Sequence, residues 1–182
     1  MHLQMRCAVP VSGAFPLCFN APHVSEIELC YTPGAGEGVR MAMLERFGDD
    51  IWIASGPVVT SMAFRYPTRM AVIRLAGGKL FIWSPVALSP DIRAEVDALG
   101  EVSFIIAPNS LHYVFLKDWN AVWPRAALYA APGVRERCKD LTFAGDLGDE
   151  APAAWSGEID QAPVRGNLIT TEVVFFHASS GT

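Results

Sequence analysis

The sequence is poor in positive charge. It has only three lysines, Lys79, Lys117 and Lys139, and a formal net charge of −5, so a nucleic-acid-binding surface is not expected. It also lacks an apolar run near the roughly 20 residues that span a bilayer, so we expect no membrane partner. Hydrophobic residues make up 51% of the 182 residues and charged residues 18%, which excludes a disordered chain and predicts one sizeable core.

Histidine and cysteine are few and unevenly placed, with no CxxC pair of the kind found in zinc or redox motifs. Of the four histidines and four cysteines, five lie in the first 40 residues: His2, His23, Cys7, Cys18 and Cys30. We expect residues 1–43 to be a poorly ordered leader or a mis-assigned start, and residues 44–182 to form the domain. A targeting segment or an extra structural element are the alternatives. Cys138 is then a lone thiol, which is typical of a reducing cytoplasm and predicts a cytoplasmic location.

Several short apolar runs predict strands. The clearest is a hairpin over residues 70–83, in which two apolar runs flank Gly77-Gly78, because glycines supply the positive φ of a tight turn. Residues 102–106 are almost continuously apolar, which is typical of a strand buried on both faces. Tyr66-Pro67-Thr68 is expected to break the preceding strand. The other predicted strands are 51–54, 58–64, 127–130, 158–164 and 172–177.

Helices are predicted between these strands. Ser89-Pro90-Asp91 combines an N-cap serine, a proline at the first helical position and an acidic first turn, and Gly100 ends the segment. A second helix is expected over 111–123, before Pro124, and a short third one over 132–141. Alternating strands and helices predict the α/β class. After the strand 172–177 only turn-like residues follow, so we also expect the C-terminus to be incomplete.

A family resemblance rests on five segments: ERFGDDIWIASGPV, FRYPTRMAVIRLAGGKLFIWSPVALSP, APNSLHYVFLKDW, LYAAPGV and GEIDQAPVRGNLITTEVVFFH. They resemble a family described only as a domain of unknown function, related to the metallo-β-lactamase-like hydrolases, over about residues 44–177. The resemblance implies an αββα sandwich with two mixed sheets face to face and helices outside. The chain would hold its first half and the start of the second. No reaction is implied, because the family has no established one.

The same resemblance shows what this chain has in place of a metal site. In typical hydrolases of the fold, the strand equivalent to 102–106 runs into an HxHxDH motif that binds one or two zinc ions. Here the loop reads Asn109-Ser110-Leu111-His112, so only His112 could ligate a metal. The acidic residue that usually follows the strand equivalent to 80–83 is Ser84. The usual metal motif is therefore not preserved.

The candidate site residues follow from their positions at strand ends. His112 could act as a general base or a ligand, and Asn109 could orient a ligand or water, although Asn109 or Ser110 could instead cap the following helix. His177 and Asp160 are the further metal-ligand candidates beside His112. Because residues 41–182 contain two histidines and one cysteine, carboxylates would have to complete a zinc or iron centre, and the inventory argues against one.

Three functions remain open. The first is a degenerate member of the fold that binds a small molecule or a protein without metal. The second is a metal-dependent hydrolase with unusual ligands around His112. The third is a non-functional truncated fragment.

Overall fold

The computed structural model describes residues 43–61, 64–166 and 170–182, and all but the last residue of the expected leader lies outside them. The strands are β1 (Glu45–Gly48), β2 (Ile51–Ser61), β3 (Phe64–Arg74), β4 (Lys79–Trp83), β5 (Glu101–Ala107), β6 (Ala127–Ala130), β7 (Gly145–Asp146), β8 (Ile159–Val164) and β9 (Glu172–His177). The helices are the 3₁₀ turn η1 (Ala76–Gly78), α1 (Pro90–Leu99) and α2 (Leu116–Val122). Neither α-helix of the described part is long and apolar enough to cross a membrane.

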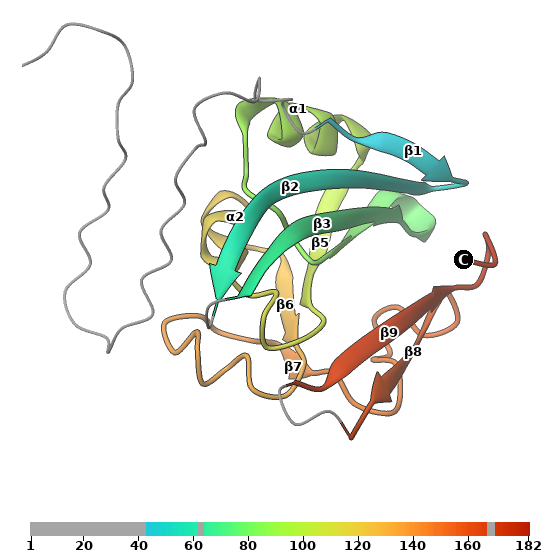
Figure 1. The fold of residues 1–182 in the computed structure, drawn as a ribbon. Coiled ribbons are helices and arrows are strands. Elements are labelled where there is room, and N and C mark those ends of the chain that lie inside the picture. Colours follow the sequence, from blue (N-terminus) through green and yellow to red (C-terminus); the bar gives the residue numbers. More distant parts are fainter. Residues whose placement is uncertain (1–42, 62–63, 167–169) are drawn as a thin grey trace, which may run out of the picture.

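Two sheets make up the framework (Figure 1). The larger has seven strands in the order β1-β2-β3-β4-β5-β6-β7, antiparallel from β1 to β4 and parallel from β4 to β7. Strands β8 and β9 form a separate antiparallel pair. Because β4, β5 and β6 are parallel, their carboxyl ends meet at one edge of the large sheet, and the loops that leave them lie together there.

The large sheet is buried on both faces, as the apolar run 102–106 predicts. Along β4, Leu80 and Ile82 point into a core shared with α1 and α2, whereas Phe81 points into a second core against β8 and β9. This alternation follows from the two-residue period of a strand. The layers are thus helices, the large sheet and the two-stranded sheet, which confirms the α/β class.

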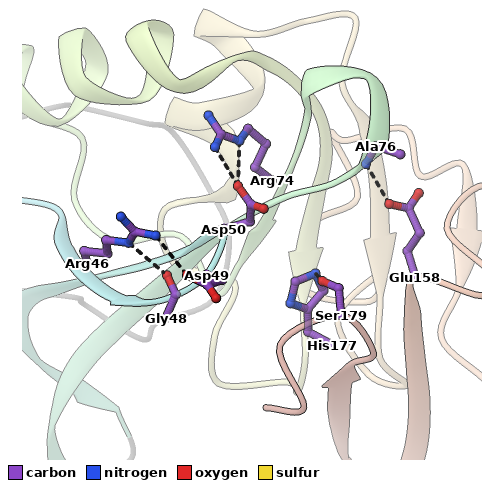
Figure 2. A network of polar contacts seen from close by, with 9 residues as sticks. All are labelled: Arg46, Gly48, Asp49, Asp50, Arg74, Ala76, Glu158, His177 and Ser179. Atoms are coloured by element: carbon purple, nitrogen blue, oxygen red, sulfur yellow. Dashed lines mark hydrogen bonds and ion pairs between the residues drawn. The ribbon is translucent and has the colours of Figure 1, made fainter.

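Aromatic packing and a few polar bonds hold the two-stranded sheet against the large one. Trp155 is 1% exposed and meets the rings of Phe81, Phe104 and Tyr129 edge-on, with centroids 4.5–5.2 Å away. Just before β8, Glu158 accepts a 2.6 Å hydrogen bond from the backbone N–H of Ala76, in the turn between β3 and β4 (Figure 2). These contacts join residues distant in sequence, so the position of β8 and β9 depends on tertiary packing.

The predicted hairpin and first helix are confirmed. Strands β3 and β4 pair antiparallel, and Gly77 and Gly78 take φ of 73° and 76° at the turn. Helix α1 begins at Pro90 with Ser89 as N-cap, whose Oγ accepts a 3.1 Å hydrogen bond from the N–H of Ile92.

Several local predictions are wrong. The two strands expected over 51–54 and 58–64 are one strand, β2, which ends at Ser61, and residue 64 begins β3. Pro67 lies inside β3 and does not break it. Strand β4 pairs only with residues 71–74 of β3, so no hydrogen bond to β4 needs an N–H at position 67. The segment expected to be helical over 111–123 is a series of turns up to Phe115 and helical only in α2. Residues 132–141 form turns and no helix.

Candidate functional site

Polar side chains gather where β4 and β5 end and β9 begins. We call Ser84, Asn109, Ser110, His112, Thr170 and Glu172 the strand-end cluster. Ser84 follows β4 directly, and the three residues 109, 110 and 112 lie in the loop after β5. Thr170 lies just before β9, and Glu172 is its first residue. Ser84, Asn109 and Ser110 are at most 5% exposed. The cluster therefore lies between the two sheets at the edge where α/β folds place their sites.

Asn109 organises the loop after β5. Its side-chain oxygen accepts hydrogen bonds from the backbone N–H groups of Leu111 (2.8 Å) and His112 (3.1 Å), which closes a turn at the start of the loop. The expectation that Asn109 or Ser110 caps the following helix is wrong, because α2 begins only at Leu116 and Phe115 occupies its N-cap position. The amide nitrogen of Asn109 donates to Oε2 of Glu172. One side chain thus fixes the turn that presents His112 and at the same time ties the loop to β9.

Three further hydrogen bonds close the junction with the second sheet. The N–H and the hydroxyl of Ser110 approach Oγ1 of Thr170 at 3.2 and 3.1 Å. The N–H of Val173 donates to the carbonyl of Pro108 at 2.9 Å. The polar groups of this loop therefore find partners within the protein, as buried polar groups generally do.

His112 is held by a hydroxyl and by two aromatic rings. Its Nδ1 lies 2.6 Å from Oγ of Ser84. The Tyr66 ring lies parallel to the imidazole with centroids 6.2 Å apart, and the Trp83 ring meets it edge-on at 6.1 Å. Burial lowers the pKa of His112, so the ring is neutral at pH 7. The arrangement leaves Nε2 as the ring atom through which His112 could contact a ligand.

Ser84 has a backbone conformation that serines seldom adopt. Its φ is +53°, in the left-handed region, and its N–H donates to the carbonyl of Ile106 at 2.9 Å. Such conformations persist only where the surroundings fix them, and they are concentrated at functional sites. In the sequence analysis Ser84 appears only as the replacement for an acidic residue, although its position directly after a buried parallel strand is a signal that could have singled it out.

We expect Ser84→Ala to release the His112 ring. Loss of the hydroxyl removes the bond that fixes the tautomer, so His112 should change from one tautomer to a mixture, at a cost of about 0.5–1.5 kcal/mol of stability. Ring ¹⁵N chemical shifts report this directly. His177 is an internal control, because its ring bonds to Ser179 and Ser180 and should not respond. Unchanged ¹⁵N shifts of His112 would show that Ser84 does not set its tautomer.

The other two sequence candidates lie away from His112. His177 ends β9, five residues beyond Glu172, so roughly 17 Å of strand separates it from the cluster. Its Nδ1 lies 2.8 Å from Oγ of Ser180. Its Nε2 lies 3.1 Å from Oγ of Ser179, which is drawn beside it in Figure 2. Asp160 is exposed on β8, opposite Phe176. The structure does not bring His112, His177 and Asp160 together.

Sequence reasoning missed Glu172. This carboxylate is half-buried, and burial raises its pKa, an effect that the hydrogen bond from Asn109 opposes. Its position at the first residue of a β-prone strand gave no sign that it would meet the loop after β5, 63 residues earlier in the chain. Only the packing of the second sheet on the first makes this contact.

An apolar groove adjoins the cluster. It has a volume of about 320 Å³ and lies between β9 and the inner face of the large sheet, where Ile53 and Ala71 form part of its floor. Glu172 and His177 both line it, so it follows β9 from one end to the other. Trp83, which contacts the His112 ring, also lines it. The groove and the cluster therefore share the Trp83–Glu172 end.

Comparison with known proteins places the chain in a family. The model of the family described as Domain of unknown function (DUF4336) matches residues 49–182. The chain belongs to this family. A search of curated proteins gives no match.

Solved structures show the fold of this family member. DIM-1 metallo-β-lactamase exposed to ceftazidime has a TM-score of 0.61 and 14% identity over 79% of this chain and 68% of its own. TMB-1 has a TM-score of 0.58 and 16% identity, over 76% of this chain and 66% of its own. The metallo-β-lactamase from Hirschia baltica has a TM-score of 0.56 and 9% identity, over 76% of this chain and 67% of its own. The chain spans about two thirds of the length of these proteins. It has a metallo-β-lactamase-like fold, which confirms that expectation.

Proposed function

We propose that this protein is a metal-independent member of the metallo-β-lactamase-like fold that binds a small molecule in the apolar groove. The observation that carries the proposal is the strand-end cluster, whose side chains hydrogen-bond to one another in loops that, by the resemblance, correspond to the metal-binding loops of typical hydrolases of the fold. Asn109 and Glu172 form one such pair, and Ser84 and His112 form another. His112 and Asn109 act here as positioning groups, because they contact Trp83 and Glu172, which line the groove.

The donor set supports this proposal. A zinc site needs about three protein ligands for catalysis and four for a structural role. Across residues 43–61, 64–166 and 170–182, no three His, Cys, Asp or Glu side chains are grouped so that they could hold a metal. His112 offers one ring nitrogen, and Glu172 is the carboxylate tied to the same loop. Two donors of this kind fall short of a zinc or iron centre.

The groove supplies the binding half of the proposal. Small-molecule sites are concave, mostly apolar and carry a few placed polar groups, with volumes of about 300–1,000 Å³. The groove of about 320 Å³ fits this description, with a half-buried carboxylate of raised pKa at one end. Perturbed pKa values in a cleft are typical of functional sites.

We expect His112→Ala and Glu172→Gln to leave the zinc content of the protein unchanged. The full-length protein and both variants would be incubated with Zn²⁺, desalted and assayed for bound zinc by mass spectrometry. The full chain can be used because the histidines and cysteines before residue 41 are present in all three proteins. Any zinc that they bind contributes equally to each measurement. One equivalent of zinc that either substitution removes would overturn metal independence.

A further inference from the structure

We infer that the groove selects an amphiphile with a cationic head and a linear apolar tail, a primary alkylammonium being the simplest example. This inference rests on the proposed function and specifies its ligand class. The decisive observation is the combination of a half-buried carboxylate, which belongs to no ion pair among the described residues, with an apolar channel that begins beside it.

The head-group preference comes from Glu172. Six ion pairs join described residues, and Glu172 belongs to none of them. Its polar partner is the neutral amide of Asn109, which reaches Oε2. A carboxylate accepts several hydrogen bonds, so capacity remains for N–H donors of a ligand. Because a charge in partly apolar surroundings is costly unless it is paired, a ligand cation at this position is favourable and a ligand anion is not.

Among the described residues that line the groove, Glu172 is the one with a carboxylate side chain, whereas His177 and Thr182 lie at the opposite end. The ring nitrogens of His177 already face the hydroxyls of Ser180 and Ser179, at 2.8 and 3.1 Å. The head group is therefore expected at the Glu172 end, beside Trp83, whose ring can also attract a cation.

The tail preference comes from the shape and lining of the groove. Between Glu172 and His177, Ile53, Ala71 and Phe175 present apolar surface along its length. The strand that borders the groove spans roughly 17 Å, which is longer than an extended eight-carbon chain with its head group. A linear tail follows such a channel and buries apolar area along it.

The test compares three probes of equal chain length: n-octylammonium, n-octanol and n-octanoate, all below their micellar concentrations. Isothermal titration calorimetry on the full-length protein should give the order octylammonium, octanol, octanoate, with at least about tenfold between the first and the last. Glu172→Gln, which keeps the size of the side chain, should remove this preference. Asp160→Asn makes the same charge change on the exposed face of β8 and should leave the preference within about twofold of wild type.

The outcomes separate the two proposals. Equal binding of all three probes, with groove residues perturbed in NMR spectra, would overturn the head-group inference and leave small-molecule binding intact. If none of the three probes binds, the proposed function is overturned as well. The NMR signals of groove residues could instead change with protein concentration and not with the probes. That result would show that a second copy of the chain occupies the groove, and it would overturn both the inference and the proposed function.

Discussion

Trp155→Ala is expected to lower the free energy of unfolding by about 3–5 kcal/mol, the range measured for deleting large buried aromatic side chains. Trp155 is 1% exposed and contacts the rings of Phe81, Phe104 and Tyr129. Its removal leaves a cavity in the middle of the core between the two sheets. The loss is a large fraction of the 5–15 kcal/mol typical of a domain. Urea unfolding followed by circular dichroism would measure it.

Two controls make this prediction specific. Trp155→Phe keeps most of the ring contacts and removes Nε1, which has no hydrogen-bond partner among the described residues, so it should cost clearly less. Phe176→Ala removes an aromatic ring of β9 that is 48% exposed, and it should change stability by no more than about 0.5 kcal/mol. A loss below about 1 kcal/mol in Trp155→Ala would show that this core does not hold the second sheet.

The parts of the fold that the sequence predicts are those with local causes. The hairpin at Gly77-Gly78 and the helix capped by Ser89 depend on residues within a few positions of each other, and both form as expected. The strand over 102–106 is recognisable because burial on both faces removes the polar alternation. The prediction at Pro67 failed because a proline excludes a strand only where the neighbouring strand needs a backbone N–H at that position. Whether it does depends on where β4 stops pairing with β3.

The candidate site was predictable only in part, for the same reason. His112 and Asn109 could be selected because they follow a buried strand, and the turn that the Asn109 side chain closes is a local property. Glu172 and Thr170 reach the cluster through the packing of one sheet on the other. No spacing rule connects residues 60 or more positions apart, so their contribution was not visible in the sequence.

These contacts also explain why binding and stability are expected to depend on the same residues. The carboxylate proposed to receive a ligand cation is the one that anchors β9 to the loop after β5. The ring that both lines the groove and contacts His112 belongs to Trp83, the last residue of β4. A substitution at the cluster therefore changes the groove and the junction between the sheets together, which is why isosteric variants are the informative ones.

Asn109→Ala and Asn109→Asp are expected to separate the two roles of this side chain. Alanine removes the acceptor for the N–H groups of Leu111 and His112 and the donor to Glu172, a loss of about 2–4 kcal/mol at any pH near neutrality. Aspartate keeps an acceptor for the two N–H groups, but it places a second carboxylate against Glu172. At pH 7 it should therefore destabilise the protein by a similar amount.

The two variants differ in how stability responds to pH. Burial already raises the pKa of Glu172, and the introduced carboxylate raises it further, so the folded Asn109→Asp variant binds a proton more tightly than the unfolded chain does. Its stability should be highest below the folded-state pKa of this carboxylate pair and fall as pH rises through that value. Urea midpoints from pH 4 to 8 would measure this. Parallel profiles for the two variants would contradict it, because they would mean that Glu172 does not face residue 109 closely enough to sense its charge.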